Sequence, residues 1–367
     1  MLNDDLVRRG RQTLTVCNAC RYCEQYCPVF PALERRRTFD AEDLTYLANL
    51  CHNCGECLYA CQFAPPHEFG INVPMVLAEA RTQSYEAYAW PFALGRAFAS
   101  SAFRTTLTAL TIVVSMLVLV SLANPEALWS SDASANFYGV IPHAAMVTLS
   151  GAVSLFVLIA LAISGSRFWR DLRRGDVPRS AGVLAPASIS LRGALRDAFT
   201  LRHLHGTGRD CTSNLEVRLP WRRWFHHCTF YGFLLCMAST TIAAIYHSVF
   251  GWHAPYAYSS LPVLLGAAGG FGLLVGPLGL AALRQTRDPA LGHEENGGLD
   301  TVFLALLFLT SLTGLALLVL RHGAVMGPLL VLHLAVVLVL LLTLPYGKFV
   351  HGLYRVLALI RYHAERE

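Results

Sequence analysis

The sequence carries little charge. Asp, Glu, Lys and Arg make up 14% of the 367 residues, hydrophobic residues make up 54%, and the mean hydropathy is +0.44. A soluble domain carries about 25% charged residues. This balance argues against a soluble globular protein and is typical of a chain that lies largely in a membrane.

The sequence also lacks the motifs of several function classes. No glycine-rich phosphate loop lies between a strand and a helix, so we expect the chain to bind neither nucleotide nor flavin, and no nucleic acid. No acid–base pair occupies a glycine-rich catalytic loop, which predicts no substrate site and no catalytic residue in this chain. The first ten residues are polar and charged, without the apolar core of a secretory signal. We therefore expect a reducing compartment, in which disulfides are rare.

Eight of the eleven cysteines form two copies of one pattern, C-x2-C-x2-C-x3-C. This is the ligand spacing of a ferredoxin with two [4Fe–4S] clusters, in which the fourth cysteine of each run binds the other cluster. A zinc site needs pairs of cysteines, so a third close cysteine would be surplus. Gln62 follows the second run in place of proline, but that position is not a ligand. The predicted ligand sets are Cys17, Cys20, Cys23 and Cys61, and Cys51, Cys54, Cys57 and Cys27.

The segment between the two cysteine runs has the pattern of a helix. Asp40 suits the N-cap, and Glu42 and Asp43 suit the positive end of the helix dipole. The apolar side chains of Leu44 and Leu47 fall on one face. A helix that leads directly into Cys51 favours an α-helical ferredoxin-like module over the small β-rich type.

Six apolar stretches are each about long enough to cross a hydrocarbon core of ~30 Å as a helix. None has a charged residue in its middle, although Asp300 lies at an edge, and the fourth is rich in glycine, which favours close helix packing. The predicted fold is therefore all-α, with a two-cluster module followed by a six-helix transmembrane bundle. The predicted spans cover residues 107–123, 140–163, 228–250, 261–283, 299–320 and 328–345.

The arginines indicate the orientation of the bundle. Residues 166–223, between spans two and three, contain twelve arginines and five acidic residues, whereas 124–139 and 248–260 contain neither Lys nor Arg. This asymmetry predicts a multi-pass protein of the bacterial inner membrane with both termini in the cytoplasm. The basic loop is expected to lie against anionic lipid headgroups or an acidic face of a partner.

The predicted organisation follows from these boundaries. It comprises a two-[4Fe–4S] ferredoxin-like domain (1–80), an amphipathic connector (81–103), transmembrane helices one and two (104–165), a basic cytoplasmic loop (166–223), transmembrane helices three to six (224–352) and a cytoplasmic tail (353–367).

Histidines near the ends of the spans are candidate axial ligands of b-type haem. His333 and His351 are eighteen residues apart, which is five helical turns or about 27 Å, so they share a face if the last helix continues past Pro345. Spans three and six run in opposite directions. We therefore expect His226 or His227 near His351 at the inner end, and His247 near His333 at the outer end.

Alternatives to these pairs remain open. His143 also lies at the outer side and is the substitute for either His247 or His333. A histidine near the end of a span is also often an ordinary interfacial residue that bonds to a carbonyl or to water. The candidate set predicts one or two haems, with ligands among His143, His226, His227, His247, His333 and His351.

Three segments complete the pattern. The doubled cysteine motif and the six-span domain, together with segments 205–211, 222–233 and 344–354, resemble the tricarballylate utilization protein B (CitB) family over essentially the full chain. The resemblance implies an electron-transfer subunit that takes electrons from a cytoplasmic FAD-dependent dehydrogenase and delivers them to the respiratory chain.

Two functions from different classes are compatible with these observations. The preferred one is electron transfer from the partner's FADH2 through two [4Fe–4S] clusters and b-type haem to the quinone pool. The alternative is a transporter or redox sensor whose membrane domain the ferredoxin module regulates. Ion-coupled carriers usually place a charged group inside the bundle, and the middles of these spans contain none.

Overall fold

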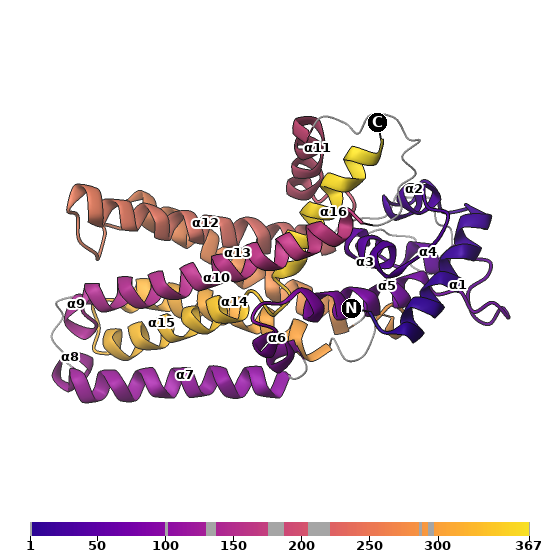
Figure 1. The fold of residues 1–367 in the computed structure, drawn as a ribbon. Helices are drawn as coiled ribbons and strands as arrows, with labels where there is room; N and C mark the ends of the chain where they lie inside the picture. Colours follow the sequence, from indigo (N-terminus) through magenta and orange to yellow (C-terminus); the bar gives the residue numbers. More distant parts are fainter. Residues whose placement is uncertain are drawn as a thin grey trace.

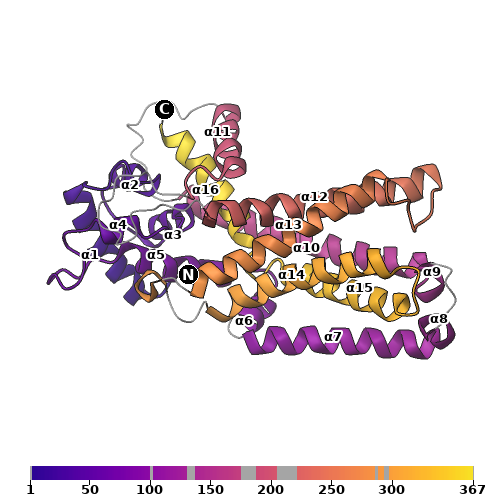
Figure 2. The ribbon, with the colours of Figure 1, turned by 180° about the vertical axis from the view of Figure 1, so that it is seen from behind.

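The computed structural model describes residues 2–99, 102–129, 137–174, 187–204, 221–285, 288–292 and 297–366. These residues form helices and connecting turns, with no strand among them, so the predicted all-α class is confirmed. Short helices gather at one end of the elongated molecule and long parallel and antiparallel helices extend from them (Figure 1). Both chain ends lie beside the short helices in both views (Figures 1 and 2).

The N-terminal module consists of short helices around a buried apolar core that includes Leu6, Leu14 and Leu47. Cysteine-bearing segments are interleaved with these helices. The helices are α1 (Asp4–Cys20), α2 (Val29–Glu34), α3 (Ala41–Leu50), α4 (Glu56–Tyr59) and α5 (Val73–Tyr88).

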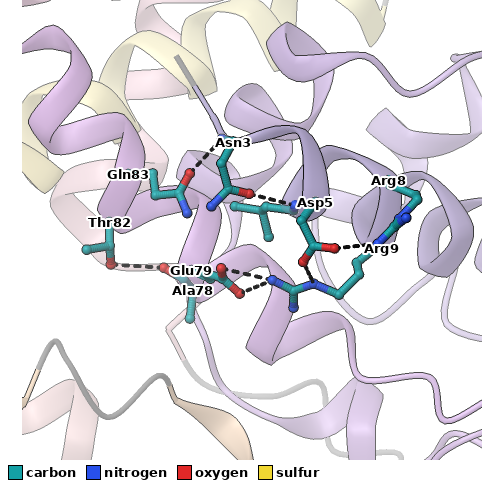
Figure 3. Close-up of polar contacts among 9 residues, drawn as sticks. Asn3, Asp5, Arg8, Arg9, Ala78, Glu79, Thr82 and Gln83 are labelled. Atoms are coloured by element: carbon teal, nitrogen blue, oxygen red, sulfur yellow. Dashed lines mark hydrogen bonds and ion pairs between the residues drawn. The ribbon is translucent and has the colours of Figure 1, made fainter.

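Polar contacts fix α1 against α5 (Figure 3). The Asn3 side chain caps α1 by accepting from the Leu6 N–H at 2.7 Å, and the Asn3 N–H donates to Gln83 at 3.0 Å. Further along the same pair of helices, the Arg9 guanidinium lies 2.8 Å from Glu79. Since α1 carries the first cysteines and α5 leads to the membrane domain, these contacts hold the first cysteine run to the rest of the molecule.

The predicted helix before Cys51 is confirmed as α3, but its polar residues behave differently from the expectation. The Asp40 side chain makes no capping bond and pairs with Arg11 at 2.7 Å. Asp43 is fully buried and lies 2.8 Å from the fully buried Arg36 guanidinium. Arg36 also lies 2.9 Å from Glu365 near the C-terminus. This ionic cluster joins the first and last parts of the chain.

The six predicted spans are confirmed as helices long and apolar enough to cross a membrane, by length and composition. Some outward-facing apolar side chains are strongly exposed, including Leu122 (78%), Val249 (71%) and Val319 (73%), as expected of surfaces that contact lipid. The spans are α7 (Ala102–Ala123), α10 (His143–Leu172), α12 (Trp221–Phe250), α13 (Leu261–Gln285), α14 (Gly297–Leu320) and α15 (Met326–Thr343).

Two of these helices are longer than a bilayer requires. About 20 residues span the hydrocarbon core, whereas α10 and α12 have 30 residues each. The C-terminal end of α10 contacts α3 and α5 of the N-terminal module. Four short helices complete the connections: α6 (Phe92–Ala99), α8 (Pro125–Trp129), α9 (Phe137–Val140) and η1 (Pro289–Leu291).

The last span does not continue to His351. Helix α15 ends at Thr343, residues 344–349 form turns, and a new helix, α16 (Val350–Arg366), begins after them. The condition that the last helix continues past Pro345, on which the shared face of His333 and His351 depended, is therefore not met, because the chain turns where Pro345 and Gly347 interrupt the apolar run. Lys348 in this turn pairs with Asp300 of α14 at 2.9 Å.

Helix α16 belongs to the core of the molecule. It packs against α3, α10 and α11 (Ala187–Thr200), as Figures 1 and 2 also show for α11. Its Tyr354 is completely buried and stacks on Phe168 of α10 with ring centroids 4.7 Å apart. His363 contacts Asp197 of α11 at 3.0 Å. Because α16 packs against α3, the candidate histidine on α16, His351, lies close to the N-terminal module.

Most glycines of α13 face α12, which confirms the expected close packing. A Cβ atom on Gly276 would lie 2.6 Å from the Thr229 nitrogen and 2.8 Å from the Phe225 carbonyl oxygen. A Cβ atom on Gly269 would lie 2.8 Å from the Gly232 carbonyl oxygen. Such distances involve backbone atoms, so only glycine allows the two helices this separation.

Gly276→Ala is therefore expected to push α12 away from α13 and to destabilise the bundle by about 1–3 kcal/mol. The measurement is the thermal unfolding midpoint of the purified protein in detergent. Gly151→Ala on α10 is the matched control, because nothing lies within 4 Å of a Cβ atom at that position. Equal midpoints for the two variants would contradict the packing described here.

Candidate functional site

The first cysteine run lies at the end of α1. Cys17 and Cys20 are three residues apart and therefore share a face of the helix. Arg21 adopts a left-handed conformation (φ 55°) that ends the helix and turns the chain, so that Cys23 follows in the next turn. The run thus combines one helical pair with a cysteine from a tight turn.

The second cysteine run begins where α3 ends. Two left-handed residues, Asn53 (φ 52°) and Gly55 (φ 88°), curl the chain after Cys51, and α4 then carries Cys57. The Asn53 N–H donates to the Cys51 sulfur at 3.3 Å. Glycine at position 55 allows this conformation without strain.

The eight sulfurs fall into the two sets that the crossover pattern requires. Cys17, Cys20, Cys23 and Cys61 line one cavity of about 240 Å³, which Cys57 also touches. Cys27, Cys51, Cys54 and Cys57 line a second, narrower cavity. Each cavity therefore receives its fourth cysteine from the other run. Ligation by these residues remains a prediction, and the structure provides the spatial grouping that it needs.

The chemistry of these thiols fits a cluster-binding role. Burial, together with the neighbouring Cys61, raises the pKa of Cys17 to about 12, and burial likewise raises the pKa of Cys23 to about 12. Burial raises the pKa of Cys57 well above its ordinary value. Cysteine binds iron as the thiolate, so binding of iron to these thiols should release protons.

A site for a single metal ion is a different arrangement. Among the residues that the structure describes, no group of three or more His, Cys, Asp or Glu side chains is placed to hold one ion. A cubane separates its ligand sulfurs across four iron atoms, so the cysteine sets suit a cluster better than an isolated ion.

Gln62 has a role that the sequence did not reveal. Its side-chain amide points to the Cys20 sulfur at 3.9 Å. Hydrogen bonds to cluster sulfurs are among the factors that set reduction potentials. The residue that replaces proline after the second run therefore contacts a ligand of the first set.

The inner histidines form one close pair. The rings of His226 on α12 and His351 on α16 have centroids 6.0 Å apart and are inclined by 75°. Two metal–imidazole bonds of about 2 Å each separate the bonding nitrogens by about 4 Å, which this spacing accommodates. His227 faces elsewhere, because its ring stacks on Tyr231 at 5.6 Å. Of the two expected partners for His351, the structure thus selects His226.

Three details suit the inner pair to bind a metal. The His351 Nδ1 is hydrogen-bonded to the Lys348 carbonyl oxygen, which orients the ring and leaves the other nitrogen available. Burial, together with Arg355, lowers the pKa of His351 well below its ordinary value, so the ring is neutral. The Nδ1 of His226 is buried and has no hydrogen-bond partner among the residues that the structure describes. The pair therefore fits bis-histidine ligation of a haem iron.

The outer histidines form a different group from the one expected. His247 stacks on His143 with ring centroids 3.6 Å apart, and its Nδ1 lies 3.2 Å from that of His253. The hydroxyl of Tyr138 lies 3.4 Å from the Nδ1 of His247. The expected pairing of His247 with His333 is thus replaced by the alternative partner, His143. Two rings stacked this closely leave no space for a haem between them, so this group does not fit one.

His333 lies apart from that group, within the helix pair α14 and α15. Its Nδ1 lies 3.0 Å from the Thr313 hydroxyl, and its ring packs over Gly314. This is the ordinary contact of a buried histidine with a neighbouring helix. A ligand role for His333 therefore remains a prediction, because no ring contact joins it to a second histidine in the described part of the chain.

Three arginines that contact the second cysteine run could not be identified as part of the site from the sequence. Arg81, Arg222 and Arg355 donate hydrogen bonds to backbone carbonyls within residues 48–53, beside Cys51. They come from three helices far apart in the chain, and in the sequence they are indistinguishable from surface arginines. Only their assembly in the fold identifies them as part of the site.

Comparisons with known proteins find similarity along most of the chain. Residues 99–367 match the model of the family described as citrate utilization protein B, and residues 10–87 match the Fer4-like domain of the same family. The chain is 42% identical over 356 residues to the citrate utilization protein B of Escherichia coli, which covers 97% of this chain and 91% of that protein. No solved structure matches the chain. The Fer4-like match indicates iron–sulfur binding by the N-terminal module.

Proposed function

The chain belongs to the citrate utilization protein B family, and on this premise we propose that it is a membrane electron-transfer protein. In this role it reoxidises the FADH2 of a partner flavoprotein dehydrogenase of citrate or tricarballylate metabolism and delivers the electrons to the quinone pool. Its cofactors are two [4Fe–4S] clusters and a b-type haem. FADH2 loses two electrons and two protons and the quinone gains the same, so the reaction balances without another reactant.

The observation that carries this proposal is the position of the inner histidine pair. His351 lies in the first turn of α16, and the same helix packs against α3, whose last residue precedes Cys51. The cysteine sets and the histidine pair are therefore joined by one rigid helix rather than by a loop. Bound clusters and haem exchange single electrons, and the chain's part is to hold them at fixed positions with little reorganisation.

The two parts of the chain have separate tasks. The cysteines of the N-terminal module hold the clusters in the cytoplasm, where a soluble flavoprotein has access to them. His226 and His351 hold the haem at the inner end of the bundle, and the exposed apolar surfaces of the spans keep that end at the membrane. The stacked outer histidines do not fit a second haem, so we propose one haem per chain.

The test of this function is a reduced-minus-oxidised optical spectrum of the purified protein. We expect sharp b-haem bands on top of a broad bleach from iron–sulfur clusters, with one haem per chain. Cluster signals without any haem would contradict electron transfer through His226 and His351 and would favour a regulatory role for the N-terminal module.

A further inference from the structure

Arginine side chains hold the segment that carries Cys51. The Arg355 guanidinium donates to the carbonyls of Asn49 (3.3 Å) and Cys51 (2.7 Å). The Arg222 guanidinium donates to the carbonyls of His52 (2.9 Å) and Asn53 (3.0 Å). The Arg81 guanidinium donates to the carbonyl of Ala48 (2.9 Å). Together the three arginines bond to five of the six backbone carbonyls of residues 48–53.

The same two helices also carry the inner histidine pair. On α12, His226 follows Arg222 by four residues, and on α16, Arg355 follows His351 by four residues. Residues four apart lie on one face of a helix, one turn or about 5.4 Å along the axis. Each helix therefore carries one arginine that bonds to the segment 48–53 and, one turn away on the same face, one histidine of the inner pair.

The backbone segment to which these arginines donate is buried. Each of the residues 48–53 is at most 8% exposed. Arg355 and Arg222 donate to neighbouring carbonyls of this buried segment, so their guanidinium groups lie close to it. Charges in such surroundings interact more strongly than on a surface, because water screens them less.

A [4Fe–4S] cluster with four thiolates is anionic and becomes more negative when it accepts an electron. Its potential depends on nearby charge, hydrogen bonding and exposure. Cations beside the cluster stabilise the reduced form more than the oxidised form. The first cysteine set has a different surrounding: its neighbour Arg21 donates to the Asn18 carbonyl at 3.1 Å but is exposed to solvent.

We propose that Arg222 and Arg355, each one helical turn from a histidine of the inner pair, are positioning residues that raise the reduction potential of the cluster held by Cys27, Cys51, Cys54 and Cys57. This makes the second cluster the exit of the N-terminal module and the first cluster its entrance. The inference rests on the proposed function for the identity of the cofactors, and it adds the order in which they work.

The experiment is a potentiometric titration of the full-length protein in detergent, with the reduced clusters followed by electron paramagnetic resonance. A Cys54→Ser variant identifies which signal belongs to the second cluster. We expect Arg222→Gln and Arg355→Gln each to lower the reduced-to-oxidised ratio of that cluster at least tenfold at a fixed potential, which is about 59 mV for one electron. The signal of the first cluster should not shift.

Two further variants separate charge from folding. Arg355→Lys retains the cation but not the forked hydrogen bonds, so it should recover most of the potential. Arg21→Gln is the matched control, because it removes an exposed arginine that bonds to a carbonyl in the first run, and it should shift neither cluster by as much as tenfold. Unchanged potentials in both glutamine variants would overturn the inference. Absence of cluster signals from the unmodified protein would instead overturn the proposed function.

Discussion

Replacing His226 or His351 with alanine is expected to remove the haem, while the iron–sulfur signals persist. The two rings face each other across 6.0 Å from different helices, so loss of either ring leaves the iron with a single protein ligand. The haem content of each variant should fall from about one per chain to a small residual fraction, as measured by the pyridine haemochrome spectrum.

His227→Ala is the matched control for this prediction. It removes a histidine adjacent to His226 in the sequence, but one whose ring stacks on Tyr231 rather than facing His351. Its haem content should equal that of the unmodified protein. Loss of haem in His227→Ala with retention in His226→Ala would show that α12 is rotated relative to the structure described here.

Replacing one cysteine of each set with serine is expected to remove or convert one cluster. A hard hydroxyl is a poor ligand for a soft iron–sulfide core, so Cys20→Ser should affect the first cluster and Cys54→Ser the second. Iron and acid-labile sulfide should each fall from about eight towards about four per chain, in addition to the haem iron.

Cys236→Ser provides the control for this pair, because that thiol lies in α12, outside both cysteine sets. Its iron and sulfide content should not change. Full cluster content in both Cys20→Ser and Cys54→Ser would contradict the ligand sets. A complete loss in either would mean that the two clusters depend on each other for assembly, which electron paramagnetic resonance of the other variant would reveal.

The features that the sequence predicted well are local ones. The cysteine spacing, the helix before Cys51 and the six spans each depend on residues close together in the chain, and the structure contains the helix and the spans as predicted. The spatial grouping of the cysteines also follows, because the crossover depends only on the order of the two runs.

The histidine pairing depended on information that the sequence does not carry. The break at residues 344–349 places His351 on a separate helix, so the five-turn spacing from His333 has no structural meaning. The choice between His226 and His227 depends on the rotation of α12 about its axis, which is set by its packing on the glycines of α13. Neither quantity can be read from periodicity.

Contacts between segments far apart in the chain also could not be predicted from the sequence. Arg36 and Glu365 are 329 residues apart and form a buried ion pair at 2.9 Å. Arg222 and Arg355 are 133 residues apart in the chain and both donate to backbone carbonyls of the second cysteine run. In the sequence both belong to basic segments that suggest only a cytoplasmic face, because charge alone does not identify what an arginine contacts.

The most direct measurement is the order of reduction in lipid vesicles that contain the protein and a short-chain quinone analogue, with photoreduced free flavin as donor under anaerobic conditions. Stopped-flow spectra should show the cluster bleach first, the haem band next and quinol last. Cys54→Ser should abolish haem reduction and quinol formation, and citrate or tricarballylate alone should reduce nothing. Quinol formation at the unmodified rate in Cys54→Ser, or reduction of the protein by either acid alone, would contradict electron transfer through this chain.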